Sequence, residues 1–187
     1  MIESIIQSDK ELLVYLNNLG SASYDAFWLF ITKQLNWMPF YLLLLYLVYK
    51  KVSLKTLGIV LLVIAGLIAF TDQFTNLVKR YFARPRPCNT EDIQALLRIV
   101  KCSDTNSFFS GHASNSTATM VFLFFLLRRY YKYTFFVFIF PLVFAYSRIY
   151  LSLHFPGDIV VGMCAGTITG TLFYQLFKWL ERKYKLV

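Results

Sequence analysis

Residues 147–158 read Ser147-Arg148-Ile149-Tyr150-Leu151-Ser152-Leu153-His154-Phe155-Pro156-Gly157-Asp158. This stretch joins two long apolar segments, about 134–150 and 157–178, so we expect it where one membrane helix ends and the next begins. Taken alone, it could still be a simple helix end with a snorkelling arginine and an N-capping aspartate.

The three charged or titratable residues of this stretch also suit catalysis. The guanidinium of Arg148 can hold an oxyanion through a fixed fork of donors. His154 can attack a substrate or carry a proton near neutral pH. Asp158 follows four residues later across a Pro-Gly turn, close enough to fix the tautomer of that imidazole.

The composition belongs to the membrane class of proteins. The 187 residues are 57% hydrophobic, 19% aromatic and 16% charged. We expect an all-α, polytopic membrane helix bundle of about five transmembrane helices, with six as the alternative. The apolar segments that predict the crossings are about 37–50, 54–78, 109–128, 134–150 and 157–178. The expected organisation is one domain, 1–187, with an interfacial N-terminal segment of amphipathic helices (1–36), a transmembrane core (37–178) and a cytoplasmic tail (179–187).

The net charge of +9 is distributed as in a membrane protein rather than a nucleic-acid binder. Three short basic clusters adjoin apolar segments and predict the cytoplasmic side: Lys50, Lys51 and Lys55; Arg128, Arg129 and Lys132; Lys178, Arg182, Lys183 and Lys185. The connections 79–108 and 147–157 then face the periplasm or the cell exterior, and the chain lies in the cytoplasmic (inner) membrane. We expect no nucleic-acid partner and no required protein partner.

Polar residues also occur within the second apolar segment. Asp72, Asn76 and Lys79 fall on one helix face. An acidic group in an apolar helix indicates a functional or a paired site, and a buried hydrogen bond between helices explains it equally well.

The fifth apolar segment carries a glycine ridge. Gly162, Gly166 and Gly170 are spaced by four residues, so they predict a helix face that a neighbouring helix approaches closely.

Two cysteines share one polar loop. Thirteen residues separate Cys88 from Cys102, which suits a disulfide if the loop faces an oxidising compartment. The sequence leaves the distance between them open.

Further cations and a second histidine lie on the predicted non-cytoplasmic side. Ser110-Gly111-His112 begins the third crossing, where free backbone N–H groups and the helix dipole favour an anion. His112 could protonate a leaving group there. The first connection adds Lys79, Arg80, Arg84 and Arg86. These cations, the helix N-terminus and the two histidines together favour phosphoryl transfer.

Two histidines and an aspartate could bind zinc. So many neighbouring arginines would repel the ion, so we expect no metal and no cofactor.

The spacing of these residues resembles the three-part signature of the type 2 phosphatidic acid phosphatase family, which is related in its site to vanadium haloperoxidases and glucose-6-phosphatase. The matching parts are Lys79 with Arg86-Pro87, Ser110-Gly111-His112, and Ser147-Arg148 with His154 and Asp158. Phe109 departs from the family, which usually has proline there. A second departure is the N-terminus, where many relatives have an additional membrane helix.

The resemblance implies a metal-free hydrolase with a phosphohistidine intermediate. His154 would be the nucleophile, Asp158 would orient it, and His112 would be the general acid. The implied phosphate-binding residues are Lys79, Arg86, Ser110, Gly111 and Arg148. Arg80 and Arg84 match no position of the signature; Arg80 suits an interfacial snorkelling residue, and Arg84 a contact with a second phosphate or an acidic headgroup.

The expected substrate is a membrane lipid with a terminal phosphate, and the expected surroundings are the lipid bilayer. Candidates are phosphatidylglycerophosphate, phosphatidic acid, undecaprenyl diphosphate and a lipid A phosphate. Two alternatives remain: a non-catalytic protein that binds or transports anionic lipids, and a phosphatase of soluble esters.

Overall fold

The computed structural model describes residues 2–185 and contains helices and loops, without strands in that range. The α-helices are α1 (Ile2–Asn18), α2 (Asp25–Ile31), α3 (Met38–Tyr49), α4 (Leu54–Phe82), α5 (Glu91–Gln94), α6 (Gly111–Leu127), α7 (Ile139–Tyr150) and α8 (Pro156–Lys183). Short 3₁₀ helices are η1 (Ala22–Tyr24), η2 (Gln34–Trp37), η3 (Pro87–Asn89) and η4 (Thr134–Phe138). The prediction of an all-α bundle is confirmed.

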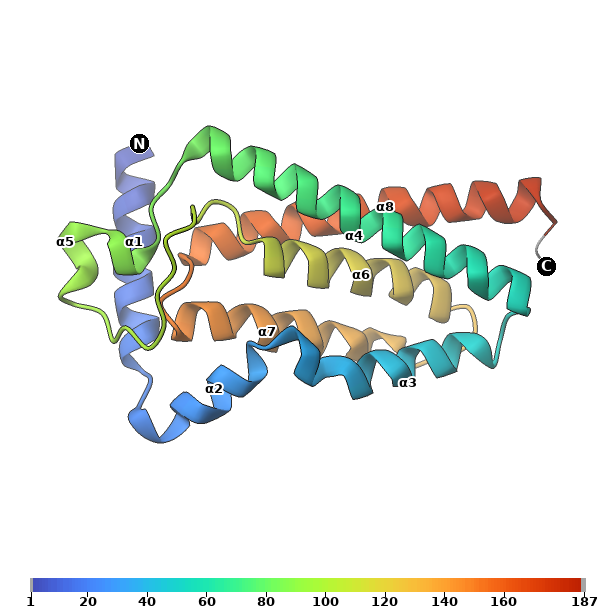
Figure 1. The fold of residues 1–187 in the computed structure, drawn as a ribbon, viewed down its shortest axis with the longest axis horizontal. Helices are drawn as coiled ribbons and strands as arrows, with labels where there is room; N and C mark the ends of the chain where they lie inside the picture. Colours follow the sequence, from blue (N-terminus) through green and yellow to red (C-terminus); the bar gives the residue numbers. More distant parts are fainter. Residues whose placement is uncertain (1, 186–187) are drawn as a thin grey trace.

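Figure 1 shows that α3, α4, α6, α7 and α8 run along the long axis of the molecule, whereas α1 crosses one end of it. The loop after α4 and the connection between α7 and α8 lie at the end that α1 crosses. The last turns of α8 lie at the opposite end. The loop after α4, the α7–α8 connection and α1 are therefore close together, although they are far apart in the chain.

Two segments of the described chain are long and apolar enough to cross a membrane, Leu54–Gln94, which begins with α4, and Pro156–Lys183, which is α8. A shorter apolar segment covers Thr134–Tyr150. Large apolar side chains on α4 and α8, such as Leu62 and Leu172, are exposed, as lipid-facing residues would be. The number of crossings stays a prediction.

Both long helices extend beyond the predicted membrane crossings. α4 continues past 78 to Phe82 and ends at Ala83, whose φ of 46° closes the helix in the left-handed region. α8 continues to Lys183, through most of the predicted tail; residues 186–187 lie outside the described range. Glu181 explains this extension, since it pairs with Lys178 and with Arg129.

The N-terminal segment forms the predicted amphipathic helix, and its inner face is tied to the rest of the molecule. Asn17 is fully buried. Its Nδ2 donates to Tyr150 O (2.8 Å) and to Ser152 Oγ (3.0 Å). Its Oδ1 accepts from Arg98 N (2.8 Å). α1 is thus joined by hydrogen bonds to the 147–158 stretch and to the loop before α6.

The glycine ridge of α8 lies against the backbone of α6. A Cβ added at Gly162 would lie 2.7 Å from Ser110 O, and one added at Gly166 or Gly170 would overlap a carbonyl of α6. Only glycine permits this approach. The ridge therefore fixes the start of α6, which carries His112, relative to the start of α8, which carries Asp158.

Replacing Gly166 with alanine is expected to lower stability by about 1–3 kcal/mol, because the new methyl group meets Ser114 O and forces the helices apart. Gly58→Ala in α4 is the matched control, since an added Cβ meets nothing within 4 Å there. The measurement is the thermal unfolding midpoint in detergent. Equal midpoints for the two variants would contradict this packing.

Candidate active site

His154 and Asp158 meet at the start of α8. His154 lies in the connection before the helix, and Asp158 is its third residue. Nδ1 of His154 is 3.3 Å from Oδ2 of Asp158, and both side chains are almost completely buried. The i, i+4 spacing across the Pro-Gly turn therefore brings the two groups together.

Neighbouring donors hold the Asp158 carboxylate in place. Oδ2 accepts from Phe155 N (3.0 Å), so Asp158 also caps its own helix. It accepts from the hydroxyl of Ser107, whose Oγ lies 3.4 Å from His154 Nδ1. Oδ1 accepts from Arg84 Nη1 (2.8 Å). A buried carboxylate with this many donors stays ionised and fixed.

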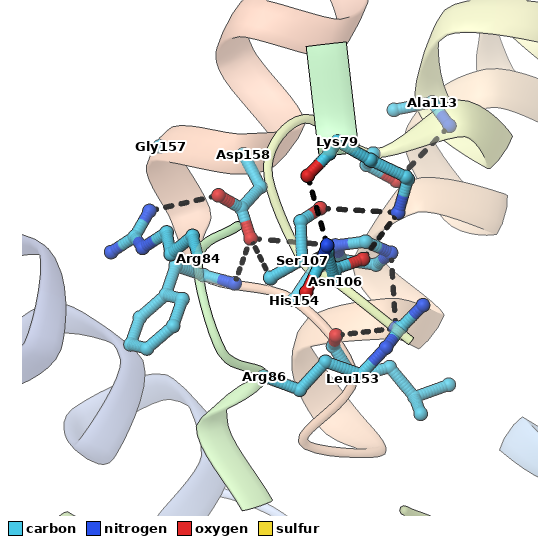
Figure 2. Close-up of polar contacts among 12 residues, drawn as sticks. Lys79, Arg84, Arg86, Asn106, Ser107, Ala113, Leu153, His154, Gly157 and Asp158 are labelled. Carbon is cyan, nitrogen blue, oxygen red and sulfur yellow. Dashed lines mark hydrogen bonds and ion pairs between the residues drawn. The ribbon is translucent and has the colours of Figure 1, made fainter. Parts of the chain in front are cut away.

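Arg86 approaches the other nitrogen of the imidazole. Its Nη1 is 3.3 Å from His154 Nε2 and donates to Leu153 O (2.7 Å). Thr105 holds the rest of the guanidinium through its carbonyl (2.9 Å) and its hydroxyl (2.8 Å). Figure 2 shows Arg86 and Asp158 reaching His154 from different sides.

These partners assign the tautomer of His154. A guanidinium can only donate, so Nε2 accepts. Nδ1 therefore carries the proton and donates a hydrogen bond to the Asp158 carboxylate. Burial lowers the pKa of the imidazole from 6.5 to about 4, although the hydrogen bond to Asp158 opposes this shift. The ring is therefore neutral at pH 7, with the lone pair of Nε2 facing Arg86.

Lys79 reaches the same place from the last turns of α4. Its Nζ donates to Asn106 O (2.7 Å) and to Ser107 O (3.3 Å). Asn106 in turn donates to Lys79 O (2.9 Å), so the loop and the helix hold each other. An ammonium has three hydrogens, which leaves one for a ligand.

The start of α6 lies beside these cations. Ser110 is the N-cap, and its Oγ accepts from Ala113 N (3.3 Å). Its backbone N donates to Asp158 O (3.0 Å). The hydroxyl hydrogen remains available, so a contact between Ser110 and phosphate stays a prediction. Gly111 and His112 line the adjoining cavity.

Arg148 is a buried cation near the end of α7. Its guanidinium lies over the ring of Phe144, 5.5 Å from the ring centre, and the His112 ring is tilted against the same ring at 5.5 Å. Its Nε has no hydrogen-bond partner, and no carboxylate of residues 2–185 pairs with it. A buried, unpaired guanidinium is an incomplete site for an anion.

A cavity of about 610 Å³ opens from these groups and continues between α3, α4 and α6. Its polar end is lined by Lys79, Arg86, Thr105, Gly111, His112 and His154. Its apolar walls include Tyr41, Leu45, Ile64, Ile68 and Leu123. Arg148 and Asp158 lie behind this lining. The cavity thus joins a cationic site to a space suited to hydrocarbon.

Polar residues also line the cavity beyond the cationic end. Asn115 Nδ2 donates to Asp72, so the acidic residue within the apolar helix is paired between helices and faces the cavity as well. Asn76 and Thr119 line the same region. Oδ1 of Asn115 is buried and has no partner in the described residues.

Thr105 and Ser107 were not predicted as site residues. They belong to a loop without helical periodicity, and neither residue type indicates a role by itself. The loop is closed by a disulfide between Cys88 and Cys102, whose Cα atoms lie 5.8 Å apart. This bond connects the two sides of the loop shortly before Thr105.

A histidine fixed by a carboxylate, facing cations at the rim of a cavity with apolar walls, defines a phosphoryl-transfer enzyme that works at the end of a membrane helix bundle. The profile of the PAP2 superfamily matches residues 56–182. The chain therefore belongs to the PAP2 superfamily and is a phosphoric-ester hydrolase, as the resemblance predicted.

Two named relatives are similar over most of the chain. The Lipid A 4'-phosphatase of Bacteroides thetaiotaomicron is 34% identical over 93% of this chain and 79% of its own length. The Lipid A 4'-phosphatase of Porphyromonas gingivalis is 26% identical over 98% of this chain and 78% of its own.

Two crystal structures share the fold. LpxE of Aquifex aeolicus has a TM-score of 0.66 at 23% identity, covering 88% of this chain and 93% of its own. The PAP2-type phosphatidylglycerolphosphate phosphatase of Bacillus subtilis has a TM-score of 0.70 at 18% identity, covering 96% and 87%.

Proposed function

We propose that this protein removes a phosphate from an acylated glucosamine lipid, as a lipid A 4'-phosphatase does. The buried, unpaired Arg148 guanidinium, which contacts the same Phe144 ring as His112, carries the proposal, because it needs an anion that the protein does not supply. Lys79 and Arg86 face the same space with donors already aligned. The cavity beyond them would hold the acyl chains.

In the proposed mechanism, Nε2 of His154 attacks phosphorus and a phosphohistidine forms as the P–O bond to the lipid breaks. His112 gives a proton to the departing oxygen. Water, giving a proton to His112, then cleaves the P–N bond and releases phosphate. Arg86, Lys79 and Arg148 would neutralise the charge on the phosphoryl oxygens throughout.

The polar groups beside the cavity support a sugar-bearing lipid. A substrate whose hydrocarbon begins close to the phosphate would leave the buried Oδ1 of Asn115 unpaired. The hydroxyl and amide groups of a phosphorylated glucosamine would supply hydrogen bonds there. The names of the two relatives agree with this choice.

We also propose that the site faces the periplasm. The three basic clusters lie at the opposite end of the bundle from the site and favour the cytoplasm (Figure 1). The Cys88–Cys102 disulfide favours an oxidising compartment on the side of the site.

Phosphate release from purified protein in detergent tests the function. We expect release from a lipid A-type phosphate to be fastest, without loss in excess EDTA, ahead of phosphatidylglycerophosphate, phosphatidic acid and undecaprenyl diphosphate. Asn115→Leu is expected to reduce this preference by about tenfold, because it removes one buried hydrogen-bonding site. Strict metal dependence would exclude the mechanism, and equal rates on water-soluble esters would exclude a lipid substrate.

A further inference from the structure

Arg84 does not have a free charge for a second phosphate or a headgroup. Its Nη1 donates to Asp158 Oδ1 (2.8 Å), and its Nη2 donates to Asp9 Oδ2 (2.8 Å). The guanidinium also lies 3.8 Å from the centre of the Phe155 ring. Both carboxylates are largely buried, at 0% and 13% side-chain exposure. Arg84 thus connects the carboxylates of Asp158 and Asp9.

Asp9 reaches this position from the helix that crosses the end of the bundle (Figure 1). Its Oδ1 accepts from Gly157 N (2.7 Å), one residue before Asp158. A Cβ on Gly157 would lie 3.0 Å from the Asp9 carboxylate, so glycine permits the contact. Asp9 therefore contacts both Arg84 and the first turn of α8.

The charges around Asp158 give Arg84 a clear function. Asp158 is fully buried, and with His154 neutral, Arg84 is its only cationic hydrogen-bond partner within residues 2–185. A buried carboxylate without a counter-charge is strongly unfavourable and attracts protons to its neighbourhood. Loss of the Arg84 charge would therefore change the protonation of the His154 imidazole, which Asp158 orients.

We propose that Arg84 is a positioning residue, held by Asp9, that keeps Asp158 charged and aimed at His154, so that the N-terminal helix α1 is part of the catalytic apparatus. The proposal rests on the proposed function, in which His154 is the nucleophile. It assigns to Arg84 a role through Asp158 and no contact with the substrate phosphate.

The test compares Arg84→Gln, Arg84→Lys and Asp9→Asn in the full chain. Arg84→Gln is expected to lower kcat by roughly ten- to a hundredfold, as loss of a group that orients a reacting side chain from behind does. KM and the inhibition constant for vanadate should stay within about threefold, because Arg84 does not touch the anion. A rise of either constant by more than about tenfold would show a phosphate ligand and overturn the proposal.

The pH profile supplies a readout that a merely structural residue would not change. Besides Asp158, the titratable or charged groups near His154 are Lys79, Arg86, His112 and Arg148. Without the Arg84 charge, Asp158 attracts the imidazole proton more strongly, so His154 is protonated at a higher pH. The acid limb of kcat should therefore move upward by about half a unit to one unit. Arg84→Lys, which keeps the charge, should restore the position of the limb in part.

Asp9→Asn should lower kcat by less than Arg84→Gln does, because it keeps the Arg84 charge and removes only one of the two carboxylates that hold the guanidinium in place. Lys10→Gln is the matched control: Lys10 is the next residue of α1 and pairs with Asp92 (2.5 Å) away from the site. Its kcat should stay within about twofold of the unmodified protein. If Arg84→Gln does not fold, Arg84→Lys and Asp9→Asn carry the test.

The two proposals fail differently. An active His154→Ala would refute the proposed function itself. An inactive His154→Ala together with an unchanged kcat and pH profile in Arg84→Gln and Asp9→Asn would refute the positioning role alone.

Discussion

Replacing His154 with alanine is expected to lower phosphate release by roughly 10⁴-fold or more, since the group that would form the covalent intermediate is gone. Asp158 would keep its bonds to Ser107, Arg84 and Phe155 N, so the site should stay assembled. The measurement is steady-state phosphate release from a lipid A-type phosphate. Rapid quenching of the unmodified protein should also trap an acid-labile phosphoenzyme that the variant lacks.

The control for this variant is its thermal midpoint in detergent, which should stay close to that of the unmodified protein. Activity within tenfold of the unmodified protein would show that His154 is not the nucleophile. The cations would then be holding phosphate for another attacking group.

Replacing His112 with alanine is expected to lower release from a lipid alcohol by about 10²–10⁴-fold, because an alkoxide leaves poorly without a proton. Release from an aryl phosphate that carries an alkyl chain should fall much less in this variant, because a phenolate leaves without protonation. The measurement is the ratio of kcat/KM for the two substrates in the variant and in the unmodified protein.

His154→Ala is the comparison for this ratio. Loss of the nucleophile should lower kcat/KM for both substrates by the same factor. Loss of the general acid should lower kcat/KM more for the lipid alcohol phosphate than for the aryl phosphate. An equal loss on both substrates in His112→Ala would assign this residue to binding or to packing on Phe144 instead.

The apolar segments and the glycine ridge were predictable because they follow helical periodicity. The same applies to Asp158, which lies four residues after His154, so that one turn of chain brings the two together. The spacing between Lys79 and Arg86 could be matched to a family. The orientation of the two side chains could not be predicted, because it depends on hydrogen bonds to carbonyls of an irregular loop.

The supporting contacts were not predictable for the same reason. Ser107 and Thr105 lie in an irregular loop, and Asp9 lies about 150 residues from the glycine it contacts. Arg84 resembled a free cation in the sequence, because only the folded chain shows the two carboxylates that occupy it. The continuation of α8 past residue 178 was not predicted either; Glu181 pairs with Lys178 and Arg129 there.

The Cys88–Cys102 disulfide would make the activity of the enzyme depend on oxidation of the loop. Thr105, which accepts hydrogen bonds from Arg86, follows Cys102 by three residues. In a newly made chain with free thiols, the loop would therefore hold Thr105 against Arg86 less firmly. Under the periplasmic orientation that we propose, maturation would wait until the loop has left the reducing cytosol. Lipids on the inner leaflet would then be spared during biosynthesis, and activity would begin only after export and oxidation.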